Sequence, residues 1–318
     1  MKNLIPLFFV LFLVSCQEDN KLEAEIATIP MDVEVHRFDQ KFAKATPETL
    51  PHLKDEYPYL FPENIADSVW VEMLSDTLQN ELESEVNIAF ADFNSETEEL
   101  ENAFRHFKYY FPEFITPKVV TVISEVDYRN KVIAADDLLL IGLDNYLGED
   151  HKFYVGIQDY IAKNLKKERI VNDVVEVYGK QLINQPKDRT FLAQMVYYGK
   201  ILYLKDKILP ESSDALKIGY TEKEMDWANT NEEEIWRYFI ENELLYDTDS
   251  QLQSRFINLA PFSKFRLQLD NESPPQLGQY IGWQIVRQFA EKNEAMSLRK
   301  VLNLPAKTIF ENSSYRPK

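Results

Sequence analysis

The only cysteine of this 318-residue chain, Cys16, directly follows a short apolar N-terminal run. One lysine precedes an apolar stretch over residues 4–14, and the small residue Ser15 stands just before the cysteine. This order is typical of a bacterial signal peptide ending in a lipobox, whose cysteine is acylated after cleavage. We therefore expect residues 1–15 to be removed and Cys16 to carry lipid. The remaining chain then has no thiol for a disulfide, so its stability has to come from a hydrophobic core.

The lipid on Cys16 makes a membrane outside the cytoplasm the first expected partner. An uncleaved anchor helix is the alternative, although an apolar run of about a dozen residues is shorter than the roughly 20 that span a bilayer. Residues 16–29 are expected to form a lipidated tether, which opens on the polar, acidic run 17–20. That run resembles the export signal of surface lipoproteins in Bacteroidetes, but any linker can be acidic. The periplasmic and surface faces therefore both stay open.

Composition excludes some classes of partner. The formal net charge is −18, whereas phosphate contacts need clustered lysine and arginine, so no nucleic-acid partner is expected. The same charge disfavours lying flat on an anionic membrane. With 13% aromatic residues and only 8 glycines, the chain favours a large helical core over a many-turned β fold.

Hydrophobic periodicity predicts an α+β fold that is mainly helical with a small β-sheet. We expect one α+β domain over residues 30–318, with a helical subdomain over 67–111. Residues 250–275 contain three prolines and are expected to be irregular. Alternating apolar residues predict strands near 33–37, 118–126 and 132–143. Helical spacing predicts helices near 67–90, 97–110, 159–166, 170–184, 188–206, 221–229, 231–245 and 276–292.

The chemistry-bearing residues form no recognised catalytic pattern. None of the four histidines is three or four residues from another, so there is no H-E-x-x-H motif for zinc. A zinc site assembled from scattered histidines and carboxylates stays open. His151 lies in a carboxylate-rich loop and His106 in an aromatic stretch, where solvation and packing are the simpler explanations. We assign no catalytic residue, metal or cofactor on these residues alone.

Two segments are dense in apolar and aromatic residues. Residues 188–210 place Phe191 and Met195 on one helical face. In residues 270–289, Gly278 and Gly282 are four residues apart, and Trp283 directly follows the second glycine. Glycines at this spacing allow another backbone to approach closely, so we expect helix packing there.

These segments resemble the gliding-motility lipoprotein family GldB of Bacteroidetes. The motifs are FLAQMVYYGKILYL, KIGYTEKEMDWANTNEEEIWRYFIENELLYDTD, APFSKF, DNESPPQLGQYIGWQIVRQF and LDNYLGEDHKFY, together with the lipobox. The likeness covers nearly the whole mature chain. It implies a cell-envelope lipoprotein needed for gliding, linked to the type IX secretion machinery, with other gliding-machinery envelope proteins as partners.

A more distant resemblance concerns mechanism. GldB-like chains are similar to a family of predicted zinc peptidases that carry H-E-x-x-H on a helix after a small sheet. When the helix predicted over 188–206 is aligned with the zinc-binding helix of that family, Ala193 and Tyr197 stand where the two zinc-binding histidines would be. Gln194 then stands where the general base would be. Zinc needs two imidazoles one turn apart and an activating carboxylate. The resemblance thus implies a zincin-like core without the metal motif, and a cleft lined by Gln194, Tyr197 and Tyr198.

Three functions follow from these patterns. The first is a non-catalytic structural or assembly factor for gliding, and therefore not an enzyme. The second is an active envelope hydrolase of the peptidase type, which would use His151 or His106 with Glu232 or Glu233. The third is a lipoprotein that binds a peptide or glycan in an aromatic cleft.

Overall fold

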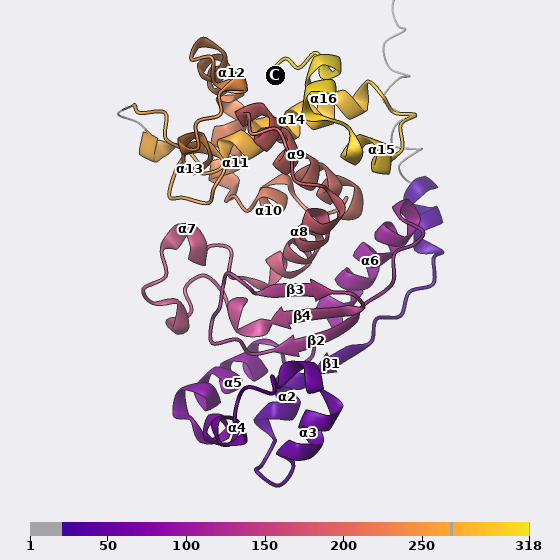
Figure 1. Ribbon diagram of the computed structural model, residues 1–318, viewed down its shortest axis with the longest axis vertical. Coiled ribbons are helices and arrows are strands. Elements are labelled where there is room, and N and C mark those ends of the chain that lie inside the picture. The colour runs from indigo at the N-terminus through magenta and orange to yellow at the C-terminus, as the bar shows by residue number, and fades with distance from the viewer. Residues whose placement is uncertain (1–20, 268–269, 318) are drawn as a thin grey trace, which may run out of the picture.

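A computed structural model describes residues 21–267 and 270–317, and Figure 1 shows a small sheet between layers of helices. The predicted signal peptide over residues 1–15 and the predicted lipidation site Cys16 lie outside the described residues. The predicted mainly helical α+β class is confirmed. No helix in the described part is both long and apolar enough to cross a membrane.

The sheet is mixed, with the strand order β1-β2-β4-β3. The first three strands in this order pair in parallel, and β3 pairs antiparallel with β4. Because neighbouring residues of a strand point to opposite faces, Val119 and Val120 belong to different sides of the sheet. The strands are β1 (Val35–Arg37), β2 (Lys118–Val122), β3 (Val132–Ala135) and β4 (Leu138–Gly142).

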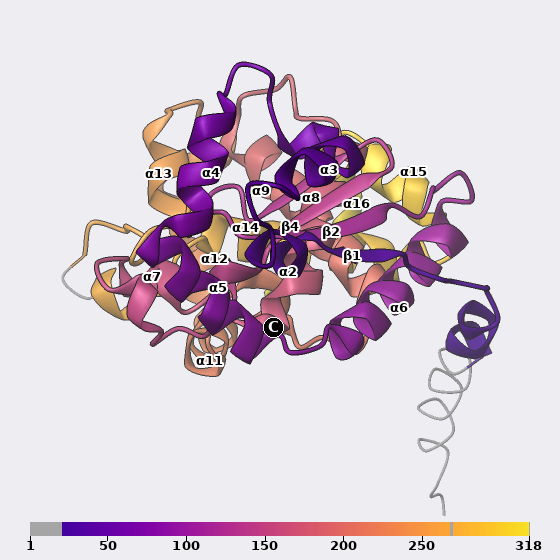
Figure 2. The same ribbon diagram turned by 90° about the horizontal axis from the view of Figure 1, so that it is seen from below.

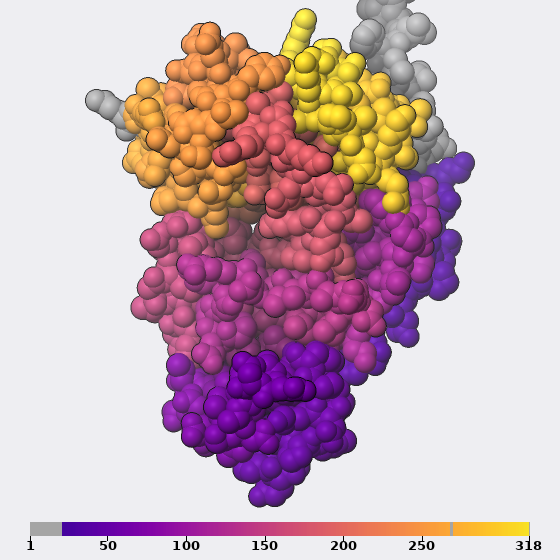
Figure 3. Space-filling model, in the orientation of Figure 1, coloured from indigo at the N-terminus to yellow at the C-terminus, as the bar shows by residue number. Residues whose placement is uncertain are grey.

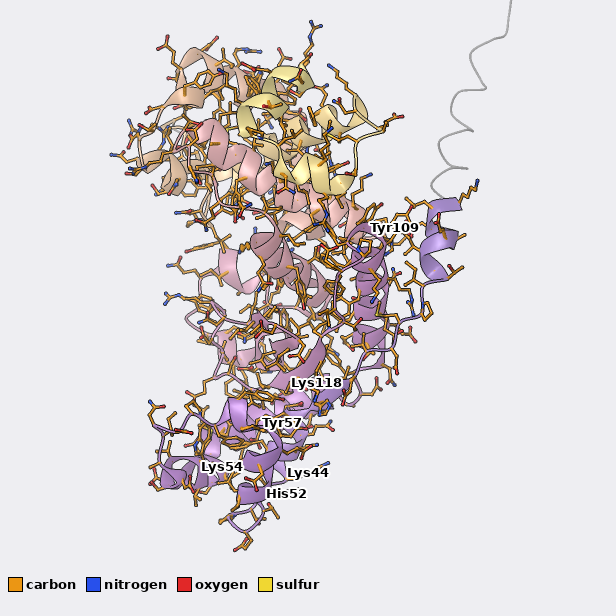
Figure 4. All side chains as sticks on the ribbon, turned by 45° about the vertical axis from the view of Figure 1, so that its right-hand side comes forward. Lys44, His52, Lys54, Tyr57, Tyr109 and Lys118 are labelled. Carbon is orange, nitrogen blue, oxygen red and sulfur yellow. The ribbon has the colours of Figure 1, made fainter. Side chains whose placement is uncertain are left out.

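The lower face of the sheet in Figure 1 carries the N-terminal helices. Val120 packs there with Phe38, Phe42 and Tyr57. The Tyr57 hydroxyl also bonds to His36 Nδ1 at 3.0 Å. Figure 4 places Tyr57 in this layer with His52 and Lys54, away from Tyr109 on α6. The helices are α2 (Phe38–Ala43), α3 (Leu50–Glu56), α4 (Asp67–Ser75) and α5 (Thr77–Ala89), with a 3-10 turn at Pro58–Leu60.

The other face of the sheet is covered by α6 and α8, which lie above the strands in Figure 1, whereas Figure 2, seen from below, has α2 and α3 in front of the strands. Val119, Leu139 and Ile141 pack there with Phe104 of α6 and Val174 of α8. Above this layer, α9 and α14 form the centre of a second core. The helices are α6 (Asn94–Tyr110), α7 (Asp159–Ala162), α8 (Ile170–Leu182), α9 (Phe191–Ile208), α10 (Asp214–Ile218), α11 (Glu222–Thr230), α12 (Glu232–Glu241), α13 (Gln251–Phe256), α14 (Leu277–Glu291), α15 (Leu298–Asn303) and α16 (Ala306–Ser313).

Residues 21–29 of the predicted tether lie within the described part of the chain. Residues 21–27 are helical, and Ile26 is only 1% exposed. Glu23 lies 3.1 Å from His106 Nε2, and Arg105 Nε donates to the Ile29 carbonyl. Two polar contacts thus join residues 23 and 29 to α6, and Ile26 between them is buried.

Three element predictions are corrected. The helix expected over 67–90 ends at Ser75 and restarts at Thr77, since the extended Asp76 caps the new helix by accepting from Gln79 N at 2.8 Å. The strand expected over 118–126 ends at Val122. The segment 250–275, expected to be irregular, contains α13.

The segment 67–111 contributes helices to both faces of the sheet. Trp70 and Met73 of α4 pack in the lower layer, whereas Phe104 and Phe107 of α6 pack on the opposite face. The sheet separates these two groups of side chains.

Candidate functional site

Helix α9 is the central element of the upper core. It begins at Phe191 rather than near 188, because the Thr190 side chain caps it by accepting from Ala193 N. Apolar residues lie all around it, and most of its side chains are buried. A helix that is apolar on every side is expected in the interior, with partners on several faces.

One face of α9 packs against α14 with backbone in direct contact. A Cβ atom built on Gly282 would stand 1.9 Å from the Met195 carbonyl oxygen, and one on Gly199 would stand 2.3 Å from the Gly282 carbonyl. Gly278 similarly faces the Phe256 carbonyl at 2.9 Å. The glycines singled out in the sequence thus lie where two backbones approach too closely for any side chain.

Trp283, the residue after Gly282 on α14, is fully buried and packs in the same core. Its Nε1 donates to Asp206 Oδ2 at 2.8 Å, and the Arg287 guanidinium lies 3.7 Å from the centre of its ring. Arg287 also forms ion pairs with Asp206 and Asp214. Trp283 therefore belongs to the packing between α9, α10 and α14.

Another face of α9 borders a pocket of about 640 Å³. In Figure 3 the rose-coloured surface of the α9 segment meets the yellow surface of the C-terminal helices. Two lysines and no carboxylate are found among the thirteen described residues that line the pocket, although the chain has 53 Asp and Glu. The lining residues are Asn184, Gln185, Pro186, Lys187, Ala193, Val196, Tyr197, Lys200, Leu302, Asn303, Leu304, Pro305 and Ala306.

Lys200 is the buried charge of this pocket. Lys200 is only 8% exposed, and its Nζ donates to the Leu304 carbonyl oxygen at 2.5 Å. Burial lowers the pKa of Lys200 from 10.5 to about 8. An ammonium has three donors, so the bond to Leu304 leaves two for a ligand.

Tyr197 lies on the same face of α9, one turn before Lys200. It is 6% exposed, and burial raises its pKa. Its ring meets that of Tyr198 edge-on, with centroids 5.0 Å apart. Tyr197 is thus a neutral phenol on the pocket wall at ordinary pH.

Gln194, Tyr197 and Tyr198, which the sequence analysis placed in one cleft, lie in different surroundings. Tyr197 lines the pocket, whereas Gln194 lines a smaller hollow with Arg189 and Thr248, and Tyr198 packs against both hydrophobic cores. The reason is helical geometry: residues at i, i+3, i+4 and i+7 share a face. The pocket face of α9 consists of Ala193, Val196, Tyr197 and Lys200.

The donor set on this face does not fit zinc. Ala193 and Tyr197, at the positions of the two imidazoles in the zinc-peptidase register, supply a methyl group and a neutral phenol. Lys200 adds an ammonium, which repels a metal cation. Within residues 21–267 and 270–317, no group of three or more His, Cys, Asp or Glu side chains is arranged to hold a metal ion.

The residues considered for a hydrolase have separate partners. His106 is buried and bonds to the Asn102 carbonyl and to Glu23. His151 Nε2 lies 3.4 Å from Glu85. Glu232 is buried and accepts from the Tyr280 and Tyr315 hydroxyls, at 3.0 and 2.6 Å. Glu233 pairs with Arg237 at 3.0 Å. No described contact joins either histidine to either glutamate.

A polar cluster at the carboxyl ends of β2 and β4 was not predicted. Buried Asp144 accepts from the backbone N–H groups of Ser124 at 3.0 Å and Val126 at 2.5 Å, and burial raises its pKa. Glu125 and Val126 both have positive φ, at 53° and 58°, a conformation that is strained for a β-branched residue. The parallel pairing of β2 and β4 brings the loops that follow them together at one edge of the sheet. The sequence does not reveal that pairing, so it could not predict this cluster.

Comparison with known proteins gives one match. The family model described as "Gliding motility protein GldB" matches residues 19–317, which is nearly the whole chain. No curated protein and no solved structure matches. The chain therefore belongs to the GldB family of gliding motility proteins.

Proposed function

We propose that this protein serves gliding motility as a lipid-anchored envelope protein that acts by binding a partner in the α9 pocket, without catalysis. The observation that carries the proposal is the composition of the pocket face. It offers a methyl group, a phenol and an ammonium where a metallopeptidase of this type needs two imidazoles and a carboxylate.

The surrounding structure supports binding over hydrolysis. The pocket volume falls in the range typical of ligand sites, and its wall combines apolar side chains with a few polar groups. Gln194, the residue at the position of the base, lies outside the pocket. An amide also does not ionise near neutral pH, so it cannot take a proton from water.

The proposal includes a zincin-like origin for the core. The order of the elements supports it, because a small sheet precedes α9 in the chain, as a small sheet precedes the zinc-binding helix in the zinc-peptidase family that the chain resembles. The link to the type IX secretion machinery and the role in assembly also belong to the proposal, on the strength of the family resemblance.

The pocket is tested by filling it. Ala306 lines its wall, so Ala306→Trp should occupy much of the space and abolish gliding while the protein remains folded and abundant. Gln194→Ala is the matched control, because Gln194 lies on the neighbouring face of α9, and it should glide normally. Colony spreading and cell tracking would measure both variants. Normal gliding with a folded Ala306→Trp protein would contradict a binding role for the pocket.

The non-catalytic part has its own measurement. Full-length protein purified in detergent is expected not to cleave a peptide library, with or without added zinc. Cleavage that a chelator abolishes would refute this part and would direct attention to His106 and His151.

Anchoring should depend on Cys16. Acylation needs its thiol, and multiple acyl chains hold a protein at a membrane where one chain is marginal. We expect Cys16→Ala to move the folded protein out of the membrane fraction, or to leave its signal peptide uncleaved. Normal processing together with full membrane retention of this variant would rule out lipid anchoring at this residue.

A further inference from the structure

Lys200 differs from the other buried lysines. Lys200, Lys205 and Lys217 are the three lysines that the described part of the chain buries. Lys205 Nζ lies 2.9 Å from Glu176, and Lys217 Nζ lies 3.1 Å from Asp206. Within residues 21–267 and 270–317, Lys200 has only the neutral Leu304 carbonyl as its hydrogen-bond partner. Buried charges are normally paired, so a buried ammonium without a counter-ion at a pocket wall points to a ligand that supplies the negative charge.

We infer that the α9 pocket binds the C-terminal carboxylate of a polypeptide, with Lys200 as its counter-ion. This inference rests on the proposed binding function of the pocket and names the chemistry of its ligand. Lys187, the other lysine of the lining, is exposed, so Lys200 is the one buried positive charge among the described lining residues. One buried positive charge matches a monoanion, because a dianion would leave one charge uncompensated in a desolvated site. The two free donors of the ammonium suit the two oxygens of a carboxylate.

The remaining lining favours a peptide as the body of the ligand. Asn184, Gln185 and Asn303 carry amides, which can both donate to and accept from peptide groups. The apolar part of the lining is aliphatic, and Tyr197 is its single aromatic residue among those described. A sugar site is expected to offer exposed aromatic faces, whereas Tyr197 is nearly buried. The volume of about 640 Å³ leaves room for side chains beyond the carboxylate itself.

Binding should also depend on pH in a defined direction. The ligand needs a charged ammonium, and the pKa of free Lys200 is about 8. Affinity should therefore be constant near pH 7 and fall as pH rises above 8. The titratable groups facing Lys200 are Tyr197 on α9 and Lys187 in the preceding loop, and the segment 302–306 contributes none. Neither of them gains a positive charge as pH rises, so neither reverses this direction.

The experiment uses full-length protein in detergent and N-terminally labelled pools of random hexapeptides. One pool has free C-termini, one has C-terminal amides, and a third has amides with a glutamate fixed at an internal position. We expect the free-acid pool to be enriched on the wild-type protein about tenfold or more over both amide pools, the size of a lost charge-assisted hydrogen bond. Individual peptides from the enriched pool should bind more weakly at pH 9 than at pH 7.

Two variants make the result specific to the pocket. Lys200→Met should abolish the preference for free acids, and Lys207→Met, which removes an equal charge from the same helix outside the pocket lining, should keep it. Thermal melts would confirm that both are folded. The inference is overturned if the free-acid pool is not retained at millimolar concentration, if Lys200→Met keeps the preference, or if internal-glutamate amides bind as well as free acids. If any of these occurs while Ala306→Trp still blocks gliding, the binding function stands and only the ligand class fails.

Discussion

Replacing Gly282 by alanine should lower the free energy of unfolding by about 3 kcal/mol or more, at the upper end of overpacking effects. The new methyl group would stand 1.9 Å from the Met195 carbonyl oxygen and 2.4 Å from its carbonyl carbon. Both atoms belong to the backbone of α9, so no side-chain rotation can relieve the contact. The two helices would have to move apart, which would disturb the core on both sides. Chemical denaturation followed by circular dichroism would measure the loss.

The sign of this effect is informative. At an uncrowded helix position, glycine to alanine would stabilise the protein by about 1 kcal/mol through helix propensity. The matched control is Gly179→Ala in α8, where the nearest neighbours of a Cβ would be side-chain methyl groups of Ile201 and Leu204, at 3.2 Å. That variant should stay within about 1 kcal/mol of wild type, because these methyl groups can shift. A neutral or stabilising Gly282→Ala would show that α9 and α14 are not in backbone contact.

The second expected result is a gain of stability. Lys200→Met should raise the free energy of unfolding at pH 7 by about 1–2 kcal/mol. The shift in pKa from 10.5 to about 8 means that the folded state disfavours the charged ammonium. Methionine fills a similar volume without a charge. The expected gain is smaller than the full linkage energy, because Lys200 keeps a small exposed fraction and because the Leu304 carbonyl loses its donor.

The pH dependence follows from the direction of the shift. Below pH 8, Lys200 is charged in both the folded and the unfolded state, so its unfavourable burial is fully present. Between pH 8 and 10.5 the folded protein releases this proton while the unfolded chain keeps it. Wild-type stability then gains up to about 1.4 kcal/mol per pH unit from this group. The advantage of Lys200→Met should therefore be largest at pH 7 and shrink towards pH 10.

The control variant Lys207→Met, on the same helix, should show no comparable gain. If Lys200→Met instead destabilises the protein at pH 7, the ammonium is well solvated or paired, and its assignment as a ligand group loses support. A stabilised protein that no longer glides would identify Lys200 as a residue kept for function at the expense of stability.

The sequence was sufficient for the elements with strong local signals. The alternation over residues 118–126 predicted β2, although the strand ends at Val122, and the helical spacing over residues 276–292 predicted α14. These signals are local, because periodicity reports the burial of one segment without reference to its partner. The glycines at 278 and 282 also predicted a close approach. The neighbours that they approach, the Met195 backbone for Gly282 and the Phe256 carbonyl for Gly278, could not be predicted, because a local pattern does not record which other segment packs against it.

The break at Asp76 and the docked residues 21–29 were missed for opposite reasons. Asp76 is a local N-cap signal that lies inside a longer apolar pattern, and the pattern dominated the prediction. Residues 21–29 follow the acidic run and carry no strong signal of their own, whereas in the structure Glu23 contacts His106 and the Ile29 carbonyl accepts from Arg105, both on α6.

By itself, the sequence determined the family, the fold class and the expected signal peptide, because these depend on composition, periodicity and long motifs. The tertiary structure alone decided the site. Lys200 is one lysine among many in the sequence, and its significance comes from a pocket formed by residues 184–187, α9 and residues 302–306. Burial by segments more than 100 residues apart removes its water without supplying a carboxylate. That physical condition depends on long-range contacts, so no local pattern records it.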